Sequence, residues 1–535
     1  MDTTRLIAEL SRPGAYPHPV AKVDLVQTHA SLLFFAGERV YKVKKAVDLG
    51  FLDFRSLLRR RHYCAEEVRL NARLAPRVHL GVAPIVRTAD GHLRVHGEGE
   101  ALEWAVEMVR LPASRMLSSC LDRGEIDNDL LNAMAARLAE FHAGCPTGPG
   151  VDEFGSPDAI AANADENFAQ LHAFVGAAGS PSAAGIQILS PEQSTFLREW
   201  QLQCVASLRG VMEDRVRRRR IRDGHGDLHA GNICLLDTGI VAYDCIEFAS
   251  RFRCGDVAAD LAFLAMDLDF RGFPAFSDYL VKRYAGVAGD AELSGLMDFY
   301  KSYRAMVRAK VAALTAADPA TDGARRTDSR RTGMRYAQLA TAYALPPALI
   351  LLCGLPATGK TWLARHLAVP LRARVLRSDV RRKLAAGMPP SGRAGADFEA
   401  GLYTPERTAR NYQSMLRDAR RDLRSGRSVI VDASFSRREF RALFTAAAAQ
   451  DGWPYFLVHV TAPEDVVQER LARRERDDRE ASDADLAVYL QARAAFEEPS
   501  EIPARRFVKA DSGEGPPEEH VGLVIDRRIA LGAPG

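Results

Sequence analysis

The sequence predicts two consecutive domains of different fold class, an α+β domain with two lobes followed by an α/β domain with a parallel sheet. Two observations carry this prediction. Residues 30–109 show short strand-like segments around one helix, and the pattern after Leu111 is mostly helical. Much later, the apolar run 348–353 leads through a glycine-rich loop into a helix, the order of elements found in parallel α/β sheets.

The first lobe is predicted to be a small antiparallel sheet with one helix. Its expected elements are strands at 30–35 and 40–44 around a tight turn, a helix at 54–74, and strands near 82–86 and 102–109. A helix-rich lobe follows and continues to about residue 216.

The main domain boundary is placed in a polar, arginine-rich stretch that begins near Ala316. The predicted division is a first domain at 1–315, a linker at 316–346 and a second domain at 347–535. A helix over 335–343 is expected to lead into the first strand of the second domain, with Pro346 and Pro347 as its stop.

The composition is that of a globular protein. Of 535 residues 47% are apolar, and 72 basic against 69 acidic residues give a net charge of +3, so no polyanionic partner is indicated. Arginine runs at 215–222 and 325–335 lack interleaved aromatic residues, which favours solvated surface or linker over nucleic-acid binding.

Features of export and membrane insertion are missing from the sequence. The eight cysteines form no C-x-x-C pair, and the N-terminus lacks a signal-like apolar core. No apolar run approaches the ~20 residues that a bilayer span requires. We therefore expect a cytoplasmic protein with no membrane partner, and the sequence leaves its oligomeric state open.

Residues 354–361 read GLPATGKT, the G-x-x-x-x-G-K-[ST] pattern of a phosphate-binding loop. Gly354 and Gly359 allow a backbone turn in which successive N–H groups point at phosphate oxygens. Lys360 would reach the β- and γ-phosphates, and Thr361 would ligate Mg²⁺. Because the motif lies between a strand and a helix, ATP binding is expected here rather than a solvated turn.

A second motif, HGDLHAGN, occupies residues 225–232, and Asp244 follows it. Asp227 and Asn232 have the spacing of the Asp and Asn in a kinase catalytic loop, with Asp244 at the place of a second metal-binding aspartate. In that chemistry a carboxylate accepts the proton of the attacking hydroxyl, while an amide and another carboxylate hold Mg²⁺. A metal cluster of His225, Asp227 and His229, or merely a polar loop, is the alternative, but neither accounts for Asn232 and Asp244 at their spacing.

With Gly226 in place of the usual arginine, this motif resembles the aminoglycoside phosphotransferase and choline kinase branch of the kinases. The resemblance implies a two-lobed protein-kinase-like fold and a small-molecule hydroxyl as acceptor. It implies that Asp227 is catalytic and that Asn232 and Asp244 bind the metal.

The same resemblance implies a strand lysine for the ATP phosphates and a helix glutamate that pairs with it. Lys42 and Glu67 are the expected pair, with Lys44 and Glu66 as substitutes. The alternative is a solvated, lysine-rich edge strand.

In the second domain two aspartates follow strand-like segments. Asp432 ends the run 428–432, where it fits a Mg²⁺-binding role, and a helix cap is its alternative. Asp379 and Arg382 form a D-x-x-R string that resembles polynucleotide 5′-hydroxyl kinases, zeta toxins and gluconate kinases. That resemblance implies Asp379 as catalytic base and Arg382 as substrate-binding residue, whereas a helix cap and a surface arginine are the alternative.

Arg470 and Arg474 are four residues apart, which places them on one helix face ahead of an acidic stretch at 477–485. The arrangement resembles the lid of the same kinases, which implies that the two arginines bind the ATP phosphates. An exposed, salt-bridged helix is the alternative.

Over nearly its whole length the chain resembles the bifunctional aminoglycoside phosphotransferase/ATP-binding proteins, in which a kinase-like domain is fused to an AAA-type P-loop kinase domain. Segments 41–54 and 69–76 add to this resemblance. It implies an ATP- and Mg²⁺-dependent phosphotransferase with two sites, each acting on a hydroxyl of a small molecule or nucleotide.

The alternative function is an ATP-binding or ATPase regulatory protein in which one domain senses nucleotide or is a pseudokinase. Asp227 and Asp379 weigh against it, because a pure binder needs no acceptor base. Protein phosphorylation is disfavoured by Gly226 and because no A-P-E-like segment follows Asp244.

Overall fold

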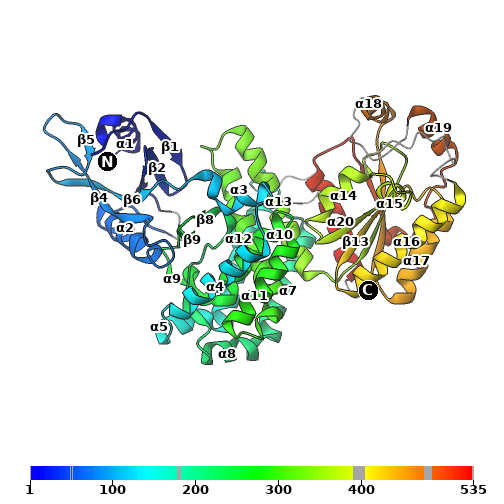
Figure 1. The fold of residues 1–535 in the computed structure, drawn as a ribbon, viewed down its shortest axis with the longest axis horizontal. Coiled ribbons are helices and arrows are strands. Elements are labelled where there is room, and N and C mark those ends of the chain that lie inside the picture. Colours follow the sequence, from blue (N-terminus) through cyan, green and yellow to red (C-terminus); the bar gives the residue numbers. More distant parts are fainter. Residues whose placement is uncertain are drawn as a thin grey trace. The chain divides into compact units, whose positions relative to one another are not determined.

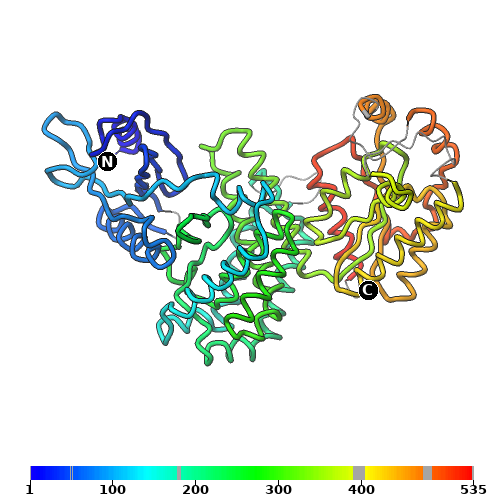
Figure 2. The backbone as a smooth tube through the Cα atoms, in the orientation of Figure 1, coloured from blue at the N-terminus to red at the C-terminus, as the bar shows by residue number. Residues whose placement is uncertain are grey.

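The computed structural model describes residues 2–532 except 49, 51, 177–181, 183, 390–403 and 475–484. The chain divides into two compact units, which are described separately (Figures 1 and 2). The first unit comprises Met1–Ile160, Val205–Leu268 and Phe273–Tyr300, and the second comprises Ala161–Cys204, Asp269–Gly272 and Lys301–Gly535.

The first unit begins with a six-stranded sheet in the order β1-β2-β3-β6-β4-β5, in which all neighbours are antiparallel. Its strands are β1 (Val23–Gln27), β2 (Ser31–Ala36), β3 (Arg39–Lys44), β4 (His79–Arg87), β5 (Leu93–Val95) and β6 (Ala101–Val109). Helix α1 (Thr3–Leu10) covers one face through a core that includes Leu6, Phe34 and Tyr41. The edge strands β1 and β5, which sequence patterning did not predict, are short.

Helix α2 (Leu57–Asn71) packs against β4 and β6 of the same sheet. Ser56 caps it, since its hydroxyl accepts a hydrogen bond from the Arg59 amide at 3.2 Å. Cys64 faces the sheet in a core with Val40 and Val106. The helix lies between β3 and β4 in the chain, as predicted, and it places Glu67 beside β3.

The rest of the first unit is mainly helical. Its helices are α3 (Leu117–Asp122), α4 (Asn128–Gly144), α5 (Pro149–Asp152), α8 (Arg209–Arg217), α9 (Ser250–Arg253), α10 (Val257–Phe270) and α11 (Pro274–Ala288). Two small antiparallel pairs, β7 (Ile221–Asp223) with β10 (Cys254–Asp256) and β8 (Ile233–Leu236) with β9 (Gly239–Ala242), hold the HGDLHAGN segment and Asp244 between them.

The arginine run 215–222 is only partly the solvated surface that its composition predicts. Arg217 and Arg218 are exposed, but Arg215 is fully buried. Its guanidinium donates to Asp256 at 2.6 Å and to Asp290 at 2.7 Å. The expectation is wrong for Arg215 because two distant carboxylates, invisible in local composition, neutralise it.

The second unit contains a five-stranded parallel sheet in the order β12-β13-β11-β14-β15. The strands are β11 (Leu349–Cys353), β12 (Ala373–Arg377), β13 (Ser428–Asp432), β14 (Tyr455–Thr461) and β15 (Phe507–Asp511). Helices α14 (Lys360–Ala368) and α20 (Pro517–Gly532) cover one face, and α16 (Pro405–Arg424) and α17 (Arg438–Asp451) cover the other (Figure 1). Helices α15 (Ser378–Ala385), α18 (Glu464–Arg474) and α19 (Leu486–Ala494) complete this part.

Residues 316–346, predicted as a linker, are mostly helical. Helix α13 runs over Gly323–Ala344 and starts twelve residues before the expected position, because Asp322 caps it through a 2.9 Å bond from the Arg325 amide. Within the second unit α13 packs on α20, where the Gln338 amide donates to the Glu518 carbonyl at 2.6 Å.

The helices α6 (Pro157–Leu171), α7 (Pro191–Ser207) and α12 (Met297–Ala317) lie largely in the second unit as well. Ser190 and Gln193, at the start of α7, each donate to the Asp526 carboxylate of α20 at 2.8 Å. The second compact unit is therefore larger than the predicted P-loop domain.

Candidate functional site

The first candidate site centres on Lys42 of β3. Its ammonium lies 2.8 Å from Glu67 Oε1 and 2.6 Å from Asp244 Oδ1. Glu66, the sequence-level substitute for Glu67, points elsewhere and pairs with Arg69 at 2.7 Å. The structure therefore brings together the strand lysine, the helix glutamate and the aspartate that the sequence singled out.

Lys44 reaches the same glutamate from the other side. Its ammonium is 2.7 Å from Glu67 Oε2 and also pairs with Glu247. Burial raises the pKa of Glu67, but the two adjacent lysines outweigh burial and hold that pKa below its usual range. Burial raises the pKa of Glu247 despite Lys44. Sequence analysis did not identify Glu247, for which no local pattern gives a signal.

The HGDLHAGN segment places Asp227 and Asn232 next to each other. The Asn232 side-chain amide donates to the Asp227 carboxylate at 3.1 Å and to the Asp227 carbonyl at 3.0 Å. Asp244 adopts a left-handed backbone conformation with φ 63°, which is strained for a residue with a side chain. The strain occurs at the residue that reaches Lys42, which is typical of a functional position.

A histidine-centred metal cluster in this segment receives no support. His229 Nε2 lies 3.6 Å from Asp227, while its Nδ1 faces the Gly231 amide at 3.1 Å. Over the described part of the chain, no group of three or more His, Cys, Asp or Glu side chains is placed to hold a metal ion. Mg²⁺ does not need such a group, since it usually binds one or two carboxylates together with substrate phosphates.

Asp260 of α10 fixes the backbone of the HGDLHAGN segment. Its carboxylate accepts hydrogen bonds from the His225 amide at 2.6 Å and the Gly226 amide at 2.8 Å. Gly226 has φ 83°, and a Cβ there would lie 2.7 Å from the Phe252 carbonyl oxygen, so a side chain does not fit. Asp260 and Gly226 together therefore set the backbone path that leads into Asp227.

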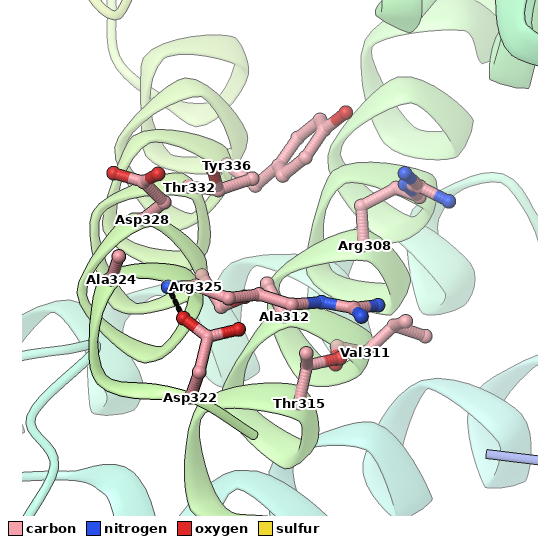
Figure 3. A pocket seen from close by; sticks show the side chains of 11 residues that line it. Arg308, Val311, Ala312, Thr315, Asp322, Ala324, Arg325, Asp328, Thr332 and Tyr336 are labelled. Atoms are coloured by element: carbon pink, nitrogen blue, oxygen red, sulfur yellow. Dashed lines mark hydrogen bonds between the residues drawn. The ribbon is translucent and has the colours of Figure 1, made fainter. Parts of the chain in front are cut away.

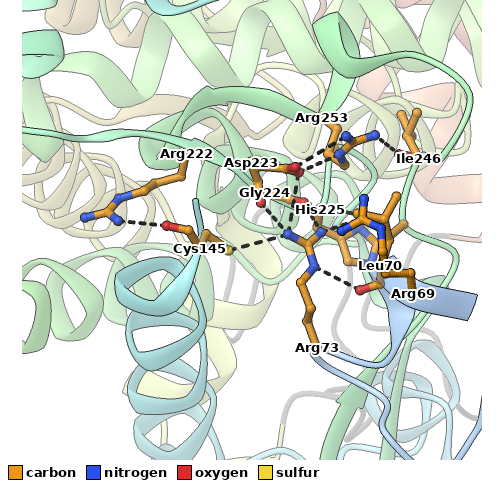
Figure 4. Close-up of polar contacts among 12 residues, drawn as sticks. Arg69, Leu70, Arg73, Cys145, Arg222, Asp223, Gly224, His225, Ile246 and Arg253 are labelled. Atoms are coloured by element: carbon orange, nitrogen blue, oxygen red, sulfur yellow. Dashed lines mark hydrogen bonds and ion pairs between the residues drawn. The ribbon is translucent and has the colours of Figure 1, made fainter. Parts of the chain in front are cut away.

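Arg73 ties α2 and the residues after it to the start of the same segment. Its guanidinium donates to the carbonyl oxygens of Asp223 at 2.5 Å and Gly224 at 2.7 Å, and its Nε donates to Leu70 at 2.9 Å (Figure 4). Arg253 pairs with the Asp223 side chain in the same cluster (Figure 4). The contacts of Arg73 with Asp223 and Gly224 cross 150 and 151 positions, which explains why no local pattern disclosed them.

The second candidate site is the loop at residues 354–361. Gly354 and Gly359 have φ values of 149° and 93°, and a Cβ at Gly354 would lie 2.4 Å from the Val460 carbonyl oxygen. Lys360 Nζ donates to the carbonyl oxygens of Gly354 at 2.9 Å and Leu355 at 2.7 Å. The loop therefore curls around its own lysine in the form expected of a phosphate cradle.

Asp432 and Thr361 meet at the carboxyl ends of the parallel strands. The Thr361 hydroxyl donates to Asp432 Oδ2 at 2.7 Å, and Arg377 Nε lies 3.6 Å from the same oxygen. Burial raises the pKa of Asp432, opposed by the Thr361 bond and the nearby Lys360 charge. Asp379 and Arg382 lie on α15, which directly follows β12, and the Arg382 guanidinium is 3.8 Å from the Asp379 carboxylate. The Asp379 charge also raises the pKa of Asp432.

Arg470 contacts the loop from α18. Its guanidinium donates to Ser512 Oγ at 2.7 Å and to the carbonyl oxygens of Ser512 at 2.9 Å and Ala357 at 3.3 Å. The rest of the expected lid lies outside the described residues, namely the Arg474 side chain and residues 475–484. The structure thus places one of the two predicted arginines beside the loop.

The residues present fit Mg²⁺ and a nucleoside triphosphate at both sites. Thr361 and Asp432 in one site, and Asn232 and Asp244 in the other, offer the oxygen ligands that Mg²⁺ prefers. In the loop, a Cβ at Gly354 or Gly359 would collide with protein atoms at 2.4 and 2.6 Å, so the turn that gathers the backbone N–H groups requires glycine at both positions.

A groove of about 520 Å³ lies elsewhere in the second unit, between α12 and α13 (Figure 3). Arg308 and Arg325 line it together with Asp322 and Asp328, so its charges favour neither an anion nor a cation (Figure 3). It contains none of the predicted site residues.

The fold and the two sites together define a class of protein: an α+β domain with an antiparallel sheet and a helical lobe, joined to an α/β domain whose parallel sheet carries a glycine-rich loop. The predicted fold classes are confirmed. Residues 349–499 match the family described as AAA domain. No helix of the described residues has the length and apolar character needed to cross a membrane.

The chain is 32% identical over 484 residues to the uncharacterized protein Rv2004c of Mycobacterium tuberculosis, covering 89% of this chain and 92% of that protein. The Mycobacterium bovis protein Mb2027c matches to the same extent. This chain belongs to the family of these mycobacterial proteins.

Two solved structures are similar at a lower level. A "putative aminoglycoside phosphotransferase" from Ralstonia eutropha is 14% identical, with 64% of this chain and 98% of that chain covered and a TM-score of 0.37. A gluconokinase from Sinorhizobium meliloti is 18% identical, with 35% and 94% covered and a TM-score of 0.25.

Proposed function

We propose that the chain is an ATP-dependent phosphotransferase with two sites, each of which transfers the γ-phosphoryl group to a hydroxyl of a small molecule or nucleotide. The observation that carries the proposal is the assembly of Lys42, Glu67 and Asp244 from three distant segments. A lysine held by a helix glutamate next to a metal-binding aspartate is the ATP-phosphate arrangement of kinases.

In the first site Lys42 binds the ATP phosphates, and Asn232 and Asp244 hold Mg²⁺, which neutralises charge on the phosphates when it is bound. Asp227 accepts the proton of the attacking hydroxyl. Its carboxylate is oriented by the 3.1 Å bond from Asn232, and the backbone of its loop is fixed by Asp260. A general base must be oriented in this way, and it must lie within hydrogen-bond reach of the hydroxyl that it deprotonates.

In the second site the backbone N–H groups of the loop and Lys360 bind phosphate, with Thr361 and Asp432 as the metal-binding pair. Asp379 serves as acceptor base, Arg382 binds the acceptor, and Arg470 and Arg474 stabilise phosphate charge. The 2.7 Å contact between Thr361 and Asp432 supports this assignment, because it gathers two oxygen ligands at the loop.

The test uses the full chain with Mg·ATP and a panel of metabolite and oligonucleotide acceptors. ADP release is expected to depend on an added acceptor. Asp227→Asn should lower turnover of one acceptor by about 100-fold or more and spare the other, and Asp379→Asn should do the reverse. Asp237→Asn, an exposed carboxylate in the first unit, is the matched control.

Hydrolysis that never depends on an acceptor would instead favour the regulatory ATPase or nucleotide sensor. If Asp227→Asn leaves all turnover unchanged, the first domain is a pseudokinase and the proposal fails for that site.

A further inference from the structure

A second buried ion pair stands beside the Lys42 site. The Lys44 side chain is 1% exposed and the Glu247 side chain 8% exposed, and the two are in direct contact. Lys44 also lies 5.0 Å from the centre of the Phe54 ring. Breaking a buried pair of this kind leaves an uncompensated charge, whereas removing both partners together is far less costly.

Glu67 connects this pair to Lys42. Each carboxylate oxygen of Glu67 faces a different lysine, Oε1 facing Lys42 at 2.8 Å and Oε2 facing Lys44 at 2.7 Å. With both oxygens engaged, the carboxylate of Glu67 has a single orientation, and Lys44 is in turn held by Glu247.

The two lysines differ in what they can reach. Lys42 keeps 14% of its side chain exposed and contacts Asp244, which is 45% exposed. Lys44 is enclosed by protein groups, so a phosphate cannot approach its ammonium without rearrangement. Lys42 is therefore placed to bind a ligand, whereas Lys44 contacts only neighbouring protein groups.

The pair also links three segments of the first unit. Lys44 comes from β3, Glu67 from α2, and Glu247 from the segment after Asp244. Asn71 of α2 strengthens the same link, because its side chain accepts a bond from the Cys245 amide at 3.0 Å and donates to the Glu67 carbonyl at 2.8 Å.

We propose that Lys44 and Glu247 are positioning residues that hold Glu67, and with it helix α2, in the arrangement in which Lys42 binds ATP. The inference rests on the proposed function of the first site. Helix α2 is thus fixed before nucleotide arrives, and the cost of ordering Lys42 is removed from the binding step.

The experiment measures ATP affinity and thermal stability of full-length variants that also carry Lys360→Ala, so that only the first site binds. The variants are Lys42→Met, Lys44→Met, the isosteric Glu247→Gln, and the double variant Lys44→Met with Glu247→Gln. Glu103→Gln is the matched control, since Glu103 forms a buried pair with Arg60 in the same lobe but contacts no site residue.

Lys44→Met is expected to weaken ATP binding about tenfold and to lower the melting temperature. The double variant should regain most of the lost melting temperature, since no charge is left unpaired, while its ATP affinity stays about tenfold weaker. Glu247→Gln should give the same affinity loss, and Glu103→Gln should change affinity less than twofold.

The inference is overturned if ATP affinity recovers with stability in the double variant, or if Glu103→Gln weakens binding as much as Lys44→Met. A different outcome addresses the proposed function: normal ATP binding by Lys42→Met would show that the first site does not use this lysine.

Discussion

The two lysines assigned to phosphate, Lys42 and Lys360, are held in different ways. Lys42 lies between carboxylates, one of them 202 positions away in the chain. Lys360 is bonded to backbone carbonyl oxygens only five and six positions before it. Lys42 is held by charged side chains from distant segments, whereas Lys360 is held by the backbone of its own loop.

This difference determines how each site depends on the rest of the fold. The loop needs two glycines with positive φ and a strand and helix on either side. The Lys42 site needs β3, α2 and the segment around Asp244 in the correct relative position. Damage far away in sequence should therefore affect the first site more than the second.

The largest expected effects come from removing each lysine in turn. Lys42→Met and Lys360→Ala should each abolish one of two Mg·ATP sites, with a loss of about 100-fold in affinity, or about 2.7 kcal/mol. Calorimetric titration of the full chain measures the stoichiometry.

Stability should separate these two variants. Lys42→Met leaves Asp244 and one oxygen of Glu67 without their cation, which should cost on the order of 2 kcal/mol. Lys360→Ala leaves two backbone carbonyl oxygens without this hydrogen bond but leaves no charge unpaired, so its melting temperature should fall much less. Equal losses of stability would contradict the contrast between the two sites.

A smaller effect is expected from Gly359→Ala. The residue has φ 93°, and a Cβ would lie 2.6 Å from Ser512 Oγ and 3.3 Å from Arg470 Nη1. ATP affinity at the second site should fall about 10- to 30-fold, or about 1.4–2 kcal/mol, with the first site unchanged. The same titration reports both sites.

The control is Gly452→Ala, which has φ 73° but no neighbouring atom within 4 Å of a built Cβ. It should cost about 1–2 kcal/mol of stability for the left-handed backbone and leave ATP affinity intact. If both glycine variants weaken ATP binding alike, crowding at the loop is not the cause.

The smallest effect is expected from Asp260→Asn. The amide retains one acceptor oxygen, so only one of the His225 and Gly226 amides keeps a good partner. Turnover at the first site should fall about fivefold, or about 1 kcal/mol, and the second site should not change. Steady-state kinetics on each site's acceptor test this, and an equal fall at both sites would count against local support of the Asp227 loop.

The glycine loop and the Lys42 site also differ in how easily their residues can be predicted from the sequence. The glycine loop was recognisable because its chemistry depends on neighbouring residues in one motif. The strands at 31–36, 39–44 and 101–109 followed from alternation and apolar content, and helix α2 followed from its position between strands.

Residues whose role depends on distant partners escaped prediction. The contacts of Glu247, Asp260 and Arg73 cross 35 to 203 positions, so no local pattern discloses what these side chains bind. Arg215 was expected at the surface because its neighbours are arginines. It is instead buried, and two aspartates neutralise its charge. Local composition shows which charges a segment carries, but it does not show which distant groups neutralise those charges.

Helix α13 also bears on where the chain can be divided. Composition suggests a cut at residue 346. A fragment that begins there would lose the hydrogen bond from Gln338 to the Glu518 carbonyl, and it would lose the bonds from Ser190 and Gln193 to Asp526. The separated C-terminal fragment would then expose the surface of α20 that these helices cover. Expression of the P-loop part alone should yield a soluble fragment more readily when it carries α13 than when it begins at 347.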